Sequence, residues 1–428
     1  MKINISNDDF KDMGLSVSQK DFYNSFVEMG FPNRKKEDWK FTDLDNILNS
    51  NFDQLTPIKK KGKFKHKKIF NFDHYSITNF NGALIDFVFP KTVSLSQLKE
   101  VNHLKKHSIF FGMRENLTPV RPMVETASKK DQMLSLNLSF LDRGYSFKIM
   151  DHLDKPLVIY NYYDDDLRGK MINNSNSIEI IDSKCTIIEV DIDKSKSKYF
   201  KNTFQKYQIN ESEVDYFFIN QNNSDGFNYT KNEIEINDLN SKKGSRFNYF
   251  IFGSGSKFRK DDYEISLNGT NSFAKINSAA ILKKGEHHEV KTKMFHSQPH
   301  CKSHQKIKNI LLENSKGIFQ GKVLVSDKAQ KTDAYQISKG LILDDNAEFS
   351  TKPELEIYAD DVKCSHGSTS GNIDQDAIYY LMTRGLPKKE ATKLIVKGFL
   401  NDVLSEISEP NIRSLIEDHL EENINNEN

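Results

Sequence analysis

Cysteine, net charge and long apolar runs are all scarce in this chain of 428 residues, and each shortage excludes a class of protein. The three cysteines, Cys185, Cys301 and Cys364, lie far apart, which excludes a disulfide framework and is typical of free thiols in a reducing compartment. Lys and Arg number 61 and Asp and Glu 60, so the net charge of +1 favours neither nucleic acid nor anionic lipid. No run approaches the roughly 18 apolar residues of a membrane span, and residues 1–9 contain no apolar signal core. We therefore expect a cytoplasmic protein with no membrane or nucleic-acid partner.

Catalytic signatures are also missing. The nearest approach to a phosphate-binding loop is Gly317 to Val323, which has one residue too few between its glycines and a valine where a magnesium-binding hydroxyl is needed. His288-Glu289 is not followed by a second histidine at the zincin spacing, and the chain has neither a C-x-x-C pair nor a G-x-S-x-G elbow. The sequence therefore predicts a protein that is not an enzyme and that relies on a partner to hydrolyse any ATP it uses.

From about residue 105 to 365 the chain is a long series of short apolar or alternating runs, separated by Gly, Asn, Asp, Lys and Ser. No strong helical period interrupts them, which leaves a sandwich, a propeller, a large barrel or a strand solenoid. The one obvious hairpin signal, Asn81-Gly82, lies outside this region, and few hairpins favour parallel stacking. We predict a mainly β protein whose core, residues 96–365, is a parallel β-helix. Helical patterns predict two end domains, one at 1–95, which also holds the small hairpin, and one at 366–428.

The C-terminal pattern predicts successive helices. Asp374 can cap a helix that Gly385 ends, and Pro387 opens a second helix as its first residue. The second helix carries an apolar face made of Ala391, Leu394, Ile395, Gly398, Phe399 and Val403. Such an end can cap a solenoid or dock a partner, and the two roles are compatible.

Two further clusters admit a functional and a plain interpretation. Five of the twelve histidines lie between His287 and His304, but the surrounding pattern is strand-like and no spacing there matches a structural zinc site. We expect these histidines to form hydrogen bonds on strand faces, with a metal role as the alternative. The basic run at 59–68 suits nucleic acid, but the charge balance of the whole chain favours a solvated linker.

Cys364 and His366 combine a soft and a borderline metal ligand two positions apart. In an extended strand both side chains point to one face, about 6.5–7 Å apart along the strand. That separation is too long for both to bind one iron without a local bend, but it suits ligands of a larger iron–sulfur cluster, or one ligand with one supporting group. The plain alternative is a buried cysteine beside a hydrogen-bonded histidine.

The segment around this pair resembles the C-terminal signature of the SufB/SufD family of iron–sulfur cluster assembly proteins. The resemblance covers most of the chain in order, with residues 140–270 matching only as generic strands. It rests on Lys352 to Thr369, Gly371 to Asp374, Tyr379 to Leu381, Arg384-Gly385, Glu390-Ala391, Pro32 to Leu44, the His296/His300/Ser303 spacing, Phe319 to Lys322, Ala329 to Thr332 and Gln336. Cys364-Ser365-His366-Gly367 lacks the glutamate that follows the histidine in the SufB form, and so looks like the SufD form.

This resemblance implies a right-handed parallel β-helix flanked by helical N- and C-terminal domains. It implies a scaffold that pairs with SufB as a heterodimer and forms a nascent iron–sulfur cluster at their interface. There His366 is the main ligand and Cys364 the second, and no cofactor is permanently bound. It also implies that the ATPase SufC docks on the C-terminal helices, and whether the chain pairs with itself in isolation is open. The candidate docking residues are Arg384, Leu394, Ile395, Phe399 and Val403.

A β-helix enzyme that acts on polysaccharide is the alternative function. Such enzymes need exposed carboxylate pairs or arginines along one solenoid face, and they are usually exported. The missing signal segment and the scarcity of cysteine argue against this alternative.

Overall fold

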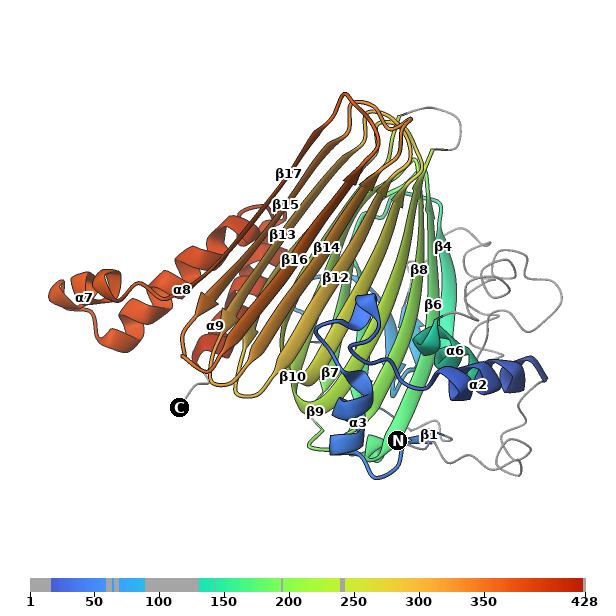
Figure 1. Ribbon diagram of the computed structural model, residues 1–428, viewed down its shortest axis with the longest axis horizontal. Helices are drawn as coiled ribbons and strands as arrows, with labels where there is room; N and C mark the ends of the chain where they lie inside the picture. Colours follow the sequence, from blue (N-terminus) through green and yellow to red (C-terminus); the bar gives the residue numbers. More distant parts are fainter. Residues whose placement is uncertain are drawn as a thin grey trace.

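Strands of the chain stack in parallel, each on a strand of the previous turn, and build the two facing ladders of a β-solenoid (Figure 1). This computed structural model describes residues 17–58, 64, 69–88, 131–141, 143–193, 195–238 and 243–425. The predicted fold, a mainly β parallel solenoid with helices towards both ends, is confirmed, and its right-handed sense stays a prediction. Parallel stacking follows from the near absence of tight hairpin turns, because parallel neighbours need crossover connections instead.

Two ladders, named here by their order in the chain, make up the solenoid. The first ladder contains, in order, β2 (Tyr75–Phe80), β5 (Leu157–Tyr163), β7 (Lys184–Asp193), the first halves of β9 (Glu213–Asn237) and β10 (Arg246–Leu267), β11 (Phe273–Leu282), β13 (Lys302–Leu311), β15 (Asp333–Ile342) and β17 (Lys363–Asn372). The second ladder contains β4 (Arg143–Ile149), β6 (Lys170–Ile181) with the short β1 (Thr56–Pro57) beside it, β8 (Phe200–Asn210), the second halves of β9 and β10, β12 (His287–His296), β14 (Lys316–Val325) and β16 (Glu348–Ile357). A short 3-10 turn (η3, Asp165–Leu167) connects β5 to β6.

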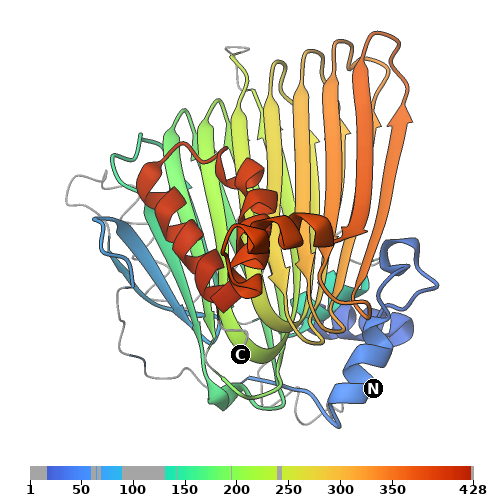
Figure 2. The same cartoon turned by 90° about the vertical axis from the view of Figure 1, so that its left-hand side faces the viewer.

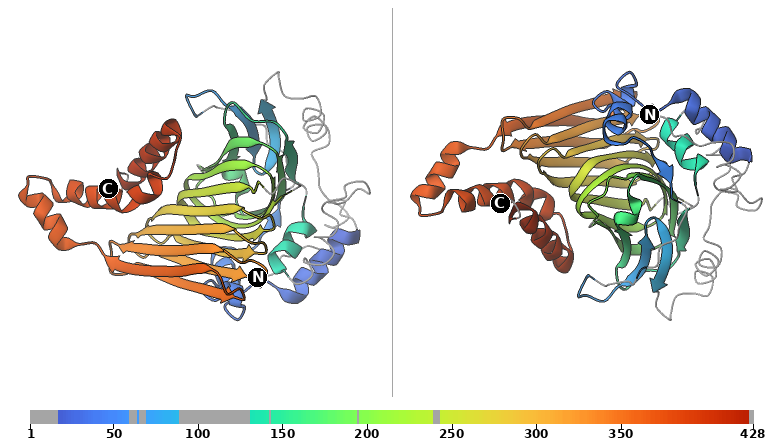
Figure 3. Two further views of the ribbon diagram at one scale, coloured as in Figure 1. Left: turned by 90° about the horizontal axis from the view of Figure 1, so that it is seen from above. Right: turned by 90° about the horizontal axis from the view of Figure 1, so that it is seen from below.

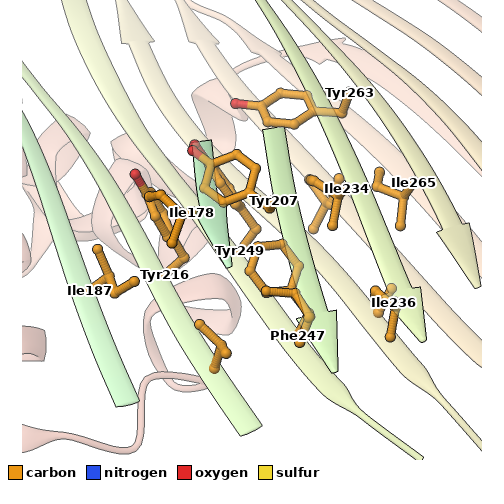
Figure 4. Packing of buried hydrophobic residues seen from close by; sticks show 14 of the residues in the cluster. Ile178, Ile187, Tyr207, Tyr216, Ile234, Ile236, Phe247, Tyr249, Tyr263 and Ile265 are labelled. Carbon is orange, nitrogen blue, oxygen red and sulfur yellow. The ribbon is translucent and has the colours of Figure 1, made fainter. Parts of the chain in front are cut away.

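Strands β9 and β10 run through both ladders without a turn and pair along almost their whole length. The pairing register shifts on either side of Ser256, near the point where the two strands pass from one ladder to the other. Between the ladders, aromatic and aliphatic side chains form the core (Figure 4). The rings of Tyr216 and Tyr249 stack there with their centroids 4.7 Å apart. These contacts join neighbouring turns into one continuous core.

The predicted hairpin is confirmed and belongs to the first turn of the solenoid. Asn81 and Gly82 have φ values of 48° and 79°, as a tight hairpin turn requires, and they join β2 to the antiparallel β3 (Ala83–Val88). Strand β2 also pairs in parallel with β5, which ties the hairpin to the ladder rather than to the N-terminal helices. At the other end, β17 continues past the boundary expected at residue 365 and runs to Asn372, because its last residues still pair with β15.

N-terminal helical segments cover the outer face of the second ladder (Figure 1). They are α2 (Val17–Met29), the 3-10 turn η1 (Glu37–Trp39), α3 (Leu44–Asn51) and α6 (Gln132–Ser139). The Trp39 ring lies 4.8 Å from the Lys260 ammonium, which is fully buried in an ion pair with Glu289. Glu37 forms an ion pair with Lys352 of β16, so this segment reaches the last turn of the solenoid.

The C-terminal helices are α7 (Gln375–Thr383), α8 (Lys388–Leu404) and α9 (Pro410–Asn425). Helices α8 and α9 lie across the outer face of the first ladder (Figure 2), whereas α7 projects away from the solenoid (Figure 3). Two predicted helix signals are confirmed, because Asp374 accepts hydrogen bonds from the first turn of α7 and Gly385 follows its end with φ of 95°. Within the described ranges, no helix combines the length and the apolar character needed to cross a membrane.

Candidate functional site

The C-terminal end of the solenoid is open. In the part of the chain that the structure describes, β17 pairs only with β15, and β16 pairs only with β14. Both strands are ten residues long and leave one row of backbone amides and carbonyls without a strand partner. Most side chains of these two strands are exposed or half-buried, in contrast to the buried pattern of the preceding turns.

Cys364 and His366 lie on β17 and face the interior of the solenoid. Cys364 packs against the interior core, and Ser368, in the same alternation, accepts a hydrogen bond from the interior-facing Ser338 at 3.1 Å. No further turn closes over this face in the described chain, so His366 remains exposed and Cys364 half-buried. Both candidate ligands therefore lie on one face of β17, as expected for an extended strand, and that face opens at the end of the solenoid.

The Cys364 thiol is protonated when no metal is present. Burial raises its pKa, and the nearby Asp333 carboxylate raises it further, although a hydrogen bond from the Ala334 backbone acts in the opposite direction. A raised thiol pKa makes metal binding release a proton, because only the thiolate is a good ligand. The surroundings of Cys364 therefore favour the thiol over the thiolate.

The other two cysteines lie inside the protein. Cys185 is buried, and burial together with Asp215 raises its pKa to about 12. Cys301 is also buried, its Sγ donates to the Gly269 carbonyl at 3.1 Å, and burial raises its pKa to about 11. Neither thiol is placed to meet iron or sulfide from solution, which leaves Cys364 as the most accessible sulfur donor.

Three of the five histidines between 287 and 304, namely His287, His288 and His296, form side-chain hydrogen bonds. The His304 ring instead packs edge-on against Phe273. His296 is fully buried and lies 2.8 Å from the Ser303 hydroxyl, and burial lowers its pKa to about 4. His288 faces Asp261 at 3.3 Å. Within the described ranges, no three side chains of His, Cys, Asp and Glu are grouped to hold a metal ion. The basic run at 59–68 lies outside the described residues, apart from Phe64.

The candidate docking residues divide between the surface and the solenoid contact. Leu394 is 51% exposed, and the exposed Arg384 guanidinium stacks on the Tyr380 ring at 5.2 Å. Ile395 is half-buried beside Ile378.

Val403, in contrast, is fully buried against the first ladder. Phe399 is half-buried, with the Lys308 ammonium 4.5 Å from its ring. Both side chains pack in the cluster that joins α8 to the first ladder, so they contact this chain's own solenoid. The surface open to another protein is therefore narrower than the helical pattern predicts.

Several exposed apolar residues on and after α7 were missed as candidate contacts. They are Tyr379, Tyr380, Met382 and Leu386, with exposed fractions from 37% to 70%. The available sequence signal is the pair of adjacent tyrosines on a short, capped helix, because neighbouring residues point about 100° apart and only Ile378 of this helix is buried. Together with Leu394 they define the α7 patch.

A buried charged cluster inside the early turns was also missed. Lys201 pairs with Asp191 at 2.5 Å, and Arg259 pairs with Asp261 at 2.6 Å. Burial alone raises the pKa of Asp261, but Arg259 and His288 outweigh it and lower the pKa to about 2. Arg259 and Asp261 pair within β10, whereas Lys201–Asp191, Arg259–Asp191 and His288–Asp261 join different strands, so the cluster is a structural element of the core.

Sequence comparisons with known proteins match most of this chain. The family described as "SUF system FeS cluster assembly, SufBD core domain" matches residues 170–399. The chain is similar to the iron–sulfur cluster assembly protein SufD of Escherichia coli, with 26% identity over 400 residues that cover 91% of this chain and 88% of that protein. It is also similar to an iron–sulfur cluster assembly SufBD family protein of Synechocystis, with 28% identity over 55% of this chain and 52% of that protein. A segment of 98 residues, covering 23% of this chain and 22% of the relative, is 37% identical to SufD of Bacillus subtilis. The family match spans more than half of the sequence, and the chain therefore belongs to the SufBD family of the SUF system for iron–sulfur cluster assembly.

Proposed function

We propose that this protein is a non-catalytic scaffold subunit that pairs with SufB through the open end of its solenoid and builds a nascent iron–sulfur cluster at that interface. His366 is the main ligand from this chain and Cys364 the second. The observation that carries the proposal is the exposure of these two interior-facing donors on the last turn, where a partner can reach them. The cluster is the cargo of the assembly, and the chain keeps no permanent cofactor.

Pairing through this end has support from both backbone and side chains. The free edges of β16 and β17 can extend their ladders with strands of another solenoid. Tyr335, Ile357 and Tyr358 are 39%, 41% and 66% exposed on these last turns and supply apolar contact area. Two protein donors leave an iron–sulfur cluster short of ligands, so the remaining ligands come from the sister chain. Without that partner, a second copy of this chain can take its place.

The α7 patch suits the docking of an ATPase, SufC in this proposal. Its aromatic and aliphatic side chains stand on a helix that projects from the solenoid (Figure 3). The nearest sequence to a phosphate loop, Gly317 to Val323, lies within the regular strand β14 and forms no anion-binding turn. ATP-driven closure of the ATPase can then pull on α7 and α8, and the solenoid can transmit the movement to the last turn.

The cluster role is tested by His366→Ala in protein co-expressed with SufB and SufC and purified without oxygen. We expect the visible absorption of the cluster to disappear while the three chains still purify together. Ser365→Ala, on the same strand but facing outward, is the matched control and should keep the cluster. A normal cluster yield in His366→Ala would refute the ligand role.

The docking role is tested by Leu394→Asp, because Leu394 is exposed and contributes little to the core. We expect this variant to lose SufC in a pull-down while it keeps SufB. Asn401→Asp puts the same charge on an exposed position of the same helix and should retain SufC. Equal recovery of SufC by the wild type and Leu394→Asp would contradict docking at the α7 patch.

A further inference from the structure

Two glutamines lie in line with His366 on the interior face of the first ladder, one on each of the two preceding strands. His366 is in register with Gln336 of β15, and Gln336 is in register with Gln305 of β13. The hydrogen bond between Ser338 and Ser368, two residues further along, fixes the facing of β15 and β17. Neighbouring strands lie about 4.8 Å apart, so the His366 imidazole is within reach of the Gln336 amide, directly or through one water.

The Gln336 amide leaves one buried acceptor without a partner. Its side chain is 1% exposed, and its Nε2 donates to the Glu354 carbonyl at 3.3 Å, which assigns Oε1 as the remaining acceptor. Oε1 accepts no hydrogen bond in this structure from any described residue, His366 included. Gln305 completes the row, because the Thr292 hydroxyl donates to its Oε1 at 2.5 Å while its Nε2 has no partner there. Buried polar atoms are rarely left without a hydrogen bond, so a donor for Gln336 Oε1 is expected.

The opposite ladder makes room for this amide. A Cβ atom added at Gly321 of β14 would lie 2.3 Å from Gln336 Oε1, which no real structure tolerates. The glycine therefore allows the glutamine side chain to extend across the interior, and the Glu354 carbonyl of β16 holds it there. The amide is thus fixed by the second ladder and lies one strand from the open end.

We propose that Gln336 is a positioning residue for His366. Its amide oxygen accepts a hydrogen bond from one ring N–H of His366. The lone pair of the other ring nitrogen then faces the open end, where a metal can bind. This inference rests on the proposed role of His366 as a cluster ligand. Metal-binding imidazoles almost always donate their second N–H to such an acceptor, and loss of the acceptor typically costs 10–100-fold in metal affinity or activity.

The first test reads the ring of His366 itself, in the full-length chain without metal. Nitrogen-15 labelled histidine reports the neutral tautomer by NMR, and His366→Ala identifies the signal. We expect one tautomer in the wild type and a mixture in Gln336→Met, which keeps the volume but removes the acceptor. Gln336→Glu, which keeps an acceptor oxygen, should restore one tautomer. An identical tautomer ratio in the wild type and Gln336→Met would overturn the proposal.

Two further variants separate positioning from folding. Gln336→Leu also removes the acceptor and should also mix the tautomers, so it replaces Gln336→Met if that variant does not fold. Lys339→Ala, on the outer face of β15, is the control and should leave the His366 ring unchanged.

The second test measures cluster yield in the assembly with SufB and SufC. We expect a loss of about tenfold in Gln336→Met with the complex intact, and recovery in Gln336→Glu. A cluster retained by His366→Ala defeats the proposed function, whereas the tautomer experiment still decides the contact between Gln336 and the ring. If His366→Ala loses the cluster but the His366 tautomer ratio is unchanged in Gln336→Met, only the inference about Gln336 is refuted.

Discussion

Glu406, just after helix α8, ties the C-terminal helices to the solenoid, and removing its charge tests that attachment. Its carboxylate accepts hydrogen bonds from Lys275 at 2.7 Å and Asn277 at 3.1 Å on β11, and from Lys306 on β13. Burial raises the pKa of Glu406, but these donors outweigh burial and lower the pKa from 4.5 to about 2. The folded protein therefore favours the ionised form.

The size of this contribution follows from the same shift. A pKa that falls from 4.5 to about 2 corresponds to about 3 kcal/mol at 1.36 kcal/mol per unit. The side chain is 25% exposed, and solvent screening reduces the contribution to about 1–2 kcal/mol. Because the folded pKa is the lower one, this stability is fully present above pH 4.5 and is lost as the pH falls towards about 2.

Hydrogen exchange of α8 and α9 is the suitable assay, because it measures the opening of these helices separately from that of the solenoid strands. We expect Glu406→Gln to lower their opening free energy by about 1–2 kcal/mol at pH 6, and the difference from the wild type to vanish near pH 2. Glu417→Gln is the matched control, since Glu417 pairs with Arg413 within α9, and it should leave α8 unchanged. A difference that stays constant with pH would refute the assignment to the Glu406 charge.

Two other predictions concern the core. Gly144→Ala should destabilise the protein by about 2–3 kcal/mol or prevent folding, because Gly144 has φ of 141° and a Cβ there would lie 1.8 Å from the Ser175 carbonyl oxygen. An unchanged urea midpoint would contradict this. The wild type should lose up to about 3 kcal/mol of stability as the pH falls from 6.5 to about 4, because His296 binds a proton in the unfolded chain but not in the buried site. His296→Gln should not show this loss. Urea midpoints of both proteins across that pH range provide the measurement, and parallel pH profiles would count against it.

Local chemistry explains which elements the sequence predicts well. The Asn81-Gly82 hairpin, the Asp374 cap and the Gly385 helix end each depend on a few neighbouring residues, and all three appear as expected. The common face of Cys364 and His366 is equally local, because it follows from strand alternation alone.

Tertiary context explains what the sequence does not predict. The runs at 213–219 and 232–236 look like separate strands, but they belong to the single strand β9, because a solenoid strand can pass from one ladder to the other without a turn. Helical periodicity marks Leu394 and Val403 as one apolar face, yet only packing decides that Val403 meets the solenoid while Leu394 meets solvent. The sequence also does not predict that His366 faces inward. Polarity cannot tell the interior face from the exterior one, because the interior also contains charged residues such as Arg259.

The open strand edges of the last turn affect the solubility of this protein when it is produced in excess. Exposed strand edges recruit other strands without selectivity, and of the two edge strands only β16 is lined with the charged side chains that usually discourage such contacts, among them Lys352, Glu354 and Glu356. Chains synthesised in excess of the partner proposed to cover β17 would keep this edge exposed, and we expect them to aggregate. Balanced expression, or an encounter with the covering partner during translation, is the condition that this geometry imposes.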